Sequence, residues 1–309
     1  PLPDLAAGAL TISVIQAVGR VAAVTLPELT LLLVAVIIAL TGGGVRALPQ
    51  SVRRGPQLAA TAALVTVGAV VAVDTVGAAA STVRAALPPW HADLDGYPGA
   101  LATAVGATGD WQLAAAAFLL TITAVLSVPH ELRREFSVVT AAMTALAVPT
   151  SLNLPWWAAP WPAVVTAIGI GTAGLSARTV RAAYTHTVTA ALVGFTGAAA
   201  SLARPGLMAA VLATLVVAGA LITVAATTGP TWAEPAAEVV AAWAAGGAAL
   251  ALPGAATAAV AHAMPSRPTL TPAALEAVTT PVLVGGFLAV SATLSYAALT
   301  QVSQRQISL

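Results

Sequence analysis

Long apolar runs, separated by short polar or proline-rich segments, recur along almost the whole chain of 309 residues. A helix needs about 20 apolar residues to cross the ~30 Å hydrocarbon layer of a bilayer, and the run at residues 26–45 has that length. In lipid every backbone N–H and C=O must be paired within the protein, which a helix achieves by itself. The pattern therefore predicts an all-α fold, a polytopic transmembrane helix bundle.

Composition supports this class and excludes others. Only 7% of the residues are charged and 59% are hydrophobic, so there are too few charges to cover a soluble globule of this size. A net charge of +1, from scattered arginines, offers no face for nucleic acid. The absence of cysteine removes disulfides, thiolate metal sites and a cysteine nucleophile. We expect the lipid bilayer as the main partner, together with other membrane subunits or further copies in a homo-oligomer.

The apolar runs define nine expected spans. They are residues 26–45, 58–80, 110–128, 136–149, 163–177, 184–202, 206–227, 236–262 and 272–300. Residues 1–26 form a separate N-terminal segment, either an interfacial helix or a tenth span, because Gln16 and Arg20 interrupt its apolar run. The transmembrane domain then covers residues 27–309 and carries an outer loop at residues 82–109.

Prolines and glycines within these runs predict local features. Pro149 should kink or end its helix, and Pro253-Gly254 should break the helix of residues 236–262. Three glycines in one span should flatten its surface for close helix packing. They are Gly169, Gly171 and Gly174.

A short polar segment at residues 129–136 (PHELRREF) orients the expected spans. Short arginine-rich loops stay on the cytoplasmic side of a membrane, so we place this one inside. Alternation then puts eight arginines inside, against Arg84, Arg204 and Arg267 outside. The eight are Arg46, Arg53, Arg54, Arg133, Arg134, Arg178, Arg181 and Arg305. This bias predicts a multi-pass protein of a bacterial plasma membrane, with the loop of residues 82–109 outside.

Two short sequences occur twice. Residues 77–81 (GAAAS) recur at 197–201, and residues 145–149 (ALAVP) resemble 249–253 (ALALP). If the first four expected spans match the next four, each unit has an even number of helices and the units share one orientation. Parallel duplication of this kind is one transporter architecture; chance similarity in an alanine-rich chain is the alternative.

Three sequence blocks carry a resemblance to known proteins. They are residues 88–94 (PPWHADL) with Tyr97-Pro98, residues 154–157 (LPWW) and residues 200–205 (ASLARP). With these blocks, most of residues 45–260 resembles uncharacterised, Ala-rich, multi-pass integral membrane proteins of actinobacteria. The resemblance implies a membrane location and carries over no activity.

The densest polar cluster lies in the expected outer loop. His91, Asp93 and Asp95 could form a hard-cation site, or a base and acids acting on a lipid-linked substrate. The alternative is an ordinary Asp-Gly turn at the membrane interface, and the remaining ligands of a calcium loop are missing. We expect no metal site here.

Three ionisable residues lie in or near the expected spans. Asp74 is the sharpest, because a carboxylate within the bilayer is costly and suggests a functional role; a neutral carboxyl or a pair with Arg84 is the alternative. Glu276 lies in the first turns of its span, where the helix dipole alone would favour it. His186, among threonines, could relay a proton or simply pack at the interface. Asp74, Glu276 and His186 are the candidates for substrate contact or proton coupling.

No catalytic motif supports an enzyme. There is no Gly-x-Ser-x-Gly, no phosphate-binding glycine loop and no HExxH, and the four histidines are too dispersed for a zinc site. We expect no cofactor and no catalytic residue. The leading hypothesis is a transporter or permease for a small solute or lipid-like substrate. The alternatives are a structural or assembly subunit of a larger membrane complex and a membrane enzyme acting on lipid-linked substrates.

Overall fold

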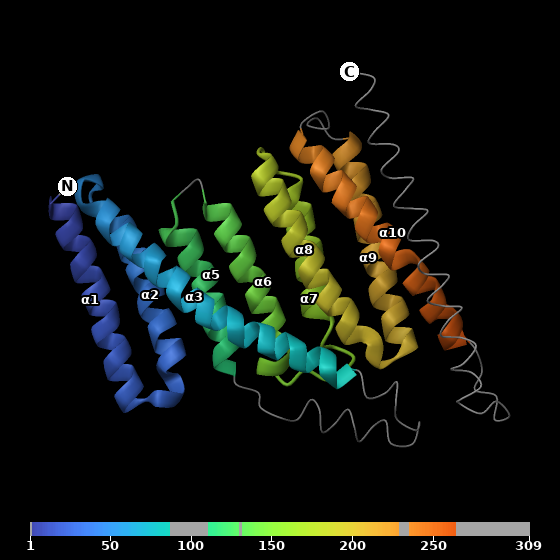
Figure 1. Ribbon diagram of the computed structural model, residues 1–309, viewed down its shortest axis with the longest axis horizontal. Coiled ribbons are helices and arrows are strands. Elements are labelled where there is room, and N and C mark those ends of the chain that lie inside the picture. Colours follow the sequence, from blue (N-terminus) through green and yellow to red (C-terminus); the bar gives the residue numbers. More distant parts are fainter. Residues whose placement is uncertain (1, 87–110, 130–131, 229–234, 264–309) are drawn as a thin grey trace.

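A computed structural model describes residues 2–86, 111–129, 132–228 and 235–263, and every element in these ranges is a helix (Figure 1). The α-helices are α1 (Leu2–Thr25), α2 (Thr30–Ala47), α3 (Gln50–Ala86), α5 (Trp111–Ser127), α6 (Arg133–Ser151), α7 (Trp161–Gly174), α8 (Val180–Ala200), α9 (Pro205–Thr228) and α10 (Pro235–Ala263). Two 3-10 helices, η1 (Pro27–Leu29) and η3 (Ser201–Ala203), join α1 to α2 and α8 to α9. The all-α prediction is confirmed for the described residues.

Five of the described helical segments are long and apolar enough to cross a membrane, as expected for a membrane protein. They are Pro3–Thr25, Pro27–Ala47, Gln50–Arg84, Gly206–Thr228 and Pro235–Ala259. Two further helices, α5 and α7, are apolar but shorter. Helices form at all the expected spans within the described ranges, and the span expected at residues 272–300 lies outside them.

The helices lie side by side in an elongated row, with one helix running obliquely across it (Figure 1). The row proceeds from α1 and α2 through α5 and α6, then α7 and α8, to α9 and α10. The oblique helix, α3, packs against α1, α2, α5, α6 and α8. Consecutive helices joined by short connections pack as antiparallel pairs, most extensively α9 with α10.

Small side chains let the helices approach closely. The largest buried cluster joins Leu64 and Val71 of α3 to Leu120 and the alanines of α5. Of the three glycines expected to flatten α7, two face neighbours: a Cβ at Gly171 would lie 3.0 Å from Ile222, and one at Gly174 would lie 3.4 Å from His186. A Cβ at Gly169 would meet nothing within 4 Å, so that glycine is not a packing residue among the described elements.

One helix, α3, extends well beyond its predicted bounds. The span expected at residues 58–80 is part of the longer α3, so Arg53, Arg54 and Arg84 lie in the helix rather than in loops. Residues 82–86 are likewise helical, although we expected the outer loop to begin at residue 82. At its start the helix runs through Gly55-Pro56, and at its end it continues past Arg84 into two alanines, which favour a helix.

The break predicted at Pro253-Gly254 is wrong, since α10 is one helix through both residues. Proline removes one backbone hydrogen bond, but packing on a neighbouring helix offsets that cost. Ala251 and Ala255, on either side of Pro253, pack with Leu212 of α9 in one buried cluster. Pro149 in contrast lies two residues before the end of α6, near the end that we expected it to set.

The N-terminal segment is a helix of span-capable length that packs lengthwise beside its neighbours. α1 and α3 cross where Gly8 meets Gly55, and a Cβ at Gly55 would overlap the backbone oxygen of Asp4. The first halves of α1 and α3 therefore touch at backbone distance, and Figure 1 shows the two helices diverging beyond this crossing.

Candidate functional site

Arginines gather on the side of the helix row where α2, α5 and α7 end, the arginine-rich end of the molecule. They bind the carbonyl groups that end neighbouring helices. The Arg46 guanidinium, in the last turn of α2, donates to Leu126 O at 3.1 Å and to Val125 O at 2.8 Å. The last carbonyls of a helix have no partner inside it, and the helix dipole favours a cation there. Arg46 thus caps α5, a contact that no sequence motif predicted.

Arg133 and Arg134, in the first turn of α6, make similar contacts. Arg134 donates to Ser176 O at 2.9 Å, just beyond the end of α7. Arg133 donates through Nε to Val128 O at 3.4 Å, just beyond the end of α5. These bonds confirm the expectation that Arg46, Arg133 and Arg134 share one end of the molecule.

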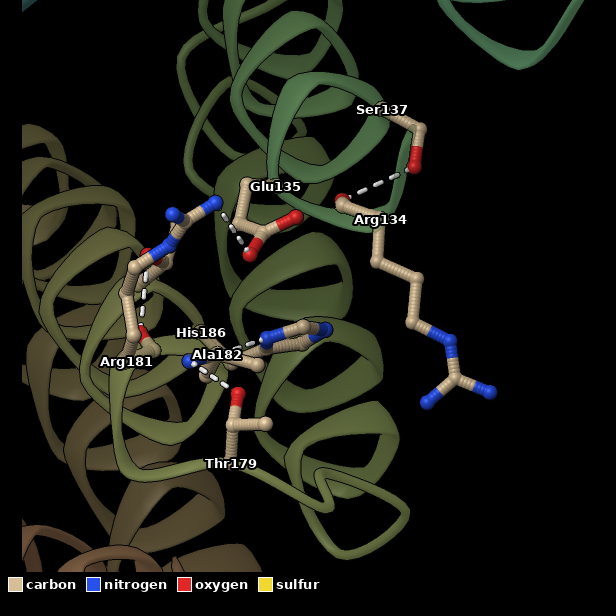
Figure 2. A network of polar contacts seen from close by, with 8 residues as sticks. Arg134, Glu135, Ser137, Thr179, Arg181, Ala182 and His186 are labelled. Carbon is tan, nitrogen blue, oxygen red and sulfur yellow. Dashed lines mark hydrogen bonds and ion pairs between the residues drawn. The ribbon is translucent and has the colours of Figure 1, made fainter. Parts of the chain in front are cut away.

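An ion pair joins α6 to α8 at the same end (Figure 2). Arg181 Nη2 lies 3.1 Å from Glu135 Oε1, with the arginine side chain 64% exposed and the glutamate 15% exposed. The Thr179 hydroxyl caps α8 by accepting a hydrogen bond from Ala182 N at 3.2 Å. Because the pair is partly open to solvent, it contributes to positioning more than to stability.

His186 lies one helical turn deeper than this ion pair and is buried (Figure 2). Its Nδ1 is 2.7 Å from Ala182 O. A carbonyl oxygen only accepts, so Nδ1 carries a proton and Nε2 remains to act as a donor or an acceptor. The two flanking threonines we singled out bond their own helix instead: Thr185 donates to Arg181 O and Thr187 to Ala183 O.

Asp74 lies on an exposed part of α3. Its side chain is exposed on the outer surface of α3 rather than enclosed in a pocket between helices. Val73 and Val76 beside it are 72% and 65% exposed, so the carboxylate lies on an apolar surface. In the part of the chain that the structure describes, no ion pair joins Asp74 to Arg84 on the same helix.

Asp74 and His186 belong to separate places, Asp74 far along the oblique helix and His186 between α7 and α8 at the arginine-rich end. The other candidates, Glu276, His91, Asp93 and Asp95, lie outside the described residues. Within the described ranges no group of three metal-binding side chains occurs together.

Two buried hydroxyl groups were not singled out from the sequence. Thr75 Oγ1 and Ser127 Oγ have no hydrogen-bond partner among the described residues. A Cβ at Gly42 of α2 would overlap the Ser127 hydroxyl, so Ser127 occupies the space that this glycine leaves. Serine, threonine and glycine are common throughout the chain, and nothing in the sequence separates these three from the rest.

An aromatic contact lies at the opposite ends of the helices, where α8 ends and α9 begins. The Arg204 guanidinium lies 4.6 Å from the ring centroid of Trp156, and Trp156 packs with Ala86 and Leu202. This cation–π contact joins the segment between α6 and α7 to the α8–α9 turn. The end of α3 meets the end of α8 here.

No protein-family model, no curated protein and no solved structure matches the chain.

Proposed function

We propose that the chain is a helical subunit of a larger membrane assembly. The supporting observation is the small fraction of each span-capable helix that the chain buries against itself. Only 17–28% of the residues in these spans are buried within the described structure. A carboxylate also lies on one of the uncovered apolar surfaces, at Asp74. Lipid solvates valine and leucine well but a carboxylate poorly, so a protein partner explains this surface better than lipid alone.

The test is to measure the mass of the protein assembly after it is extracted together with its native lipid. Extraction of the protein with a polymer that retains native lipid, followed by mass photometry or native mass spectrometry, measures the assembly directly. A subunit gives a particle of fixed stoichiometry with a protein mass above the 30.4 kDa of this chain. A protein mass equal to one chain, unchanged by milder extraction, contradicts the proposal.

A transporter for a small solute or lipid-like substrate is the second candidate, supported by the position of the two sequence repeats. The GAAAS segments lie in α3 and in α8 with η3, and both Ser81 and Ser201 bond the carbonyl three residues earlier. The ALAVP and ALALP segments lie in α6 and α10. These are the pairs that a four-plus-four parallel repeat requires.

Several contacts between the helices of the first proposed unit, α2 to α6, have counterparts in the second unit, α7 to α10. α3 packs on α6 as α8 packs on α10, and α5 pairs with α6 as α9 pairs with α10. α2 contacts α5 as α7 contacts α9. Uptake of a solute into proteoliposomes, with its pH dependence lost in Asp74→Asn or Glu276→Gln, would favour this candidate. No uptake across a broad solute panel would favour the subunit.

A further inference from the structure

The outer faces of α1 and α3 carry residues that lipid does not solvate well. On α1, Ser13, Gln16 and Arg20 are all exposed. Their spacing of three and four residues places them on one face of the helix. A membrane-spanning helix rarely turns such a polar stripe toward lipid unless another helix covers it.

The face of α3 has the opposite charge. Asp74 lies among exposed Val70 and Val73, with the exposed Gly77 one turn further along the same face. A Cβ at Gly77 would meet nothing within 4 Å, so this part of α3 is open to a close approach by another helix. Asp74 thus has an apolar surround and a glycine beside it, the features of a helix-packing surface.

Arg20 and Asp74 do not form an ion pair with each other within one molecule. Neither has a hydrogen bond or an ion pair in the part of the chain that the structure describes. α1 and α3 touch at their first halves, at Gly8 and Gly55, and then diverge toward the ends that carry Arg20 and Asp74 (Figure 1). Among the described residues, neither charge therefore has a partner in its own molecule.

The two helices run in the same sense, and both charges lie in the second halves of their helices. α1 and α3 both run away from the arginine-rich end, so copies with one orientation in a membrane would bring them together as parallel helices. Arg20 lies five residues before the end of α1, about 8 Å along its axis, and Asp74 lies twelve residues before the end of α3, about 18 Å. The oblique course of α3 in Figure 1 shortens the second distance when it is measured along the membrane normal.

We propose that this surface binds a second copy of the chain, with Arg20 of one copy paired to Asp74 of the next. The inference rests on the proposed role as an assembly subunit and names its partner. Charge complementarity favours a second copy, because the chain itself supplies both exposed charges on parallel helices. The contact joins two different surfaces, so repetition closes a ring or continues as a row of subunits.

Cysteine cross-linking tests the contact directly, because the chain contains no cysteine. One tagged copy carries Val24→Cys, one turn beyond Arg20, and a differently tagged copy carries Gly77→Cys, one turn beyond Asp74. Co-expressed in membranes and treated with a mild oxidant, they should form a disulfide that joins the two tags. Leu10→Cys, also exposed but in the first half of α1, is the matched control and should not cross-link to Gly77→Cys.

Substitution of the two charged residues is the second test of the contact. Asp74→Asn or Arg20→Gln should lower the cross-linked fraction by about tenfold, equivalent to ~1.4 kcal/mol. The exchanged pair Asp74→Arg with Arg20→Asp should restore it, which a merely misfolded single variant cannot explain. Circular dichroism and a thermal melt of each variant establish that it folds.

The outcomes separate this inference from the proposed function. A particle heavier than one chain, with no cross-link between the two tags and no rescue by exchange, overturns the α1–α3 contact and leaves the subunit role in place. A cross-link between two Gly77→Cys copies instead identifies a two-fold α3 interface and also overturns the contact. A particle with the mass of one chain overturns both proposals.

Discussion

Single residues in this protein act mainly by ending helices and by setting helix separations. Arg46 and Arg134 bind terminal carbonyls of α5 and of the segment after α7, and Thr179 caps α8. The sequence predicted that these arginines lie at one end of the molecule, because charge bias depends only on position along the chain. It could not predict which carbonyl each guanidinium reaches, because that depends on how helices 40 to 80 residues apart pack.

Arg46→Ala should lower the free energy of unfolding by about 1 kcal/mol, since it removes two hydrogen bonds to the end of α5. Arg54→Ala is the control, because Arg54 is exposed and its side chain makes no hydrogen bond or ion pair within the described residues. Thermal unfolding in one detergent, followed by tryptophan fluorescence, measures both. Equal melting temperatures for the two variants would show that capping by Arg46 adds no stability.

The sequence predicted which segments are helical better than it predicted where each helix begins and ends. Each apolar run in the described ranges forms a helix, because run length and lipid solvation determine that outcome locally. The extension of α3 to Gln50 and Ala86 and the continuity of α10 through Pro253 were not predicted. Both depend on neighbours: α3 is covered by several helices in turn, and Pro253 lies where α10 packs on α9.

The α1–α3 crossing gives a test at this scale. Gly55→Ala should destabilise the protein by about 1–3 kcal/mol, because the new methyl group would overlap the backbone of α1 and push the helices apart. Gly68→Ala, in the same helix, meets nothing within 4 Å and should be neutral or stabilising by up to about 1 kcal/mol.

Chemical unfolding in mixed micelles compares these two glycine variants with the parent. The same change in both variants would show that the close contact at Gly55 does not determine the result. A neutral Gly55→Ala would mean that α1 shifts without cost.

For the whole molecule, the sequence predicted the membrane class and the clustering of arginines but not the row arrangement or the large uncovered surfaces. Among the site candidates, it singled out Asp74, whose functional role stays a prediction. A sequence identifies a costly carboxylate within an apolar run. Only the packing of α3 on its neighbours determines which face of the helix the carboxylate occupies.

The orientation in the membrane is open to a direct experiment. A cysteine at Ser176, exposed at the arginine-rich end, should resist a membrane-impermeant maleimide in intact cells and react after permeabilisation. A cysteine at Glu28, exposed at the opposite end, should react in intact cells. The reverse pattern would invert the topology, and labelling of both would show that the two residues do not lie on opposite sides.

The oblique course of α3 has a consequence for how the protein is made. The face that carries Leu64, Val71 and Thr75 is buried by helices synthesised later, as far along the chain as α8, which ends at Ala200. At 5–20 residues per second, translation from Ala86 to Ala200 takes roughly 6–23 s. During that interval α3 has left the ribosome but lacks its final neighbours. Its alanine- and valine-rich surface lets lipid serve as a temporary solvent until those helices pack on it.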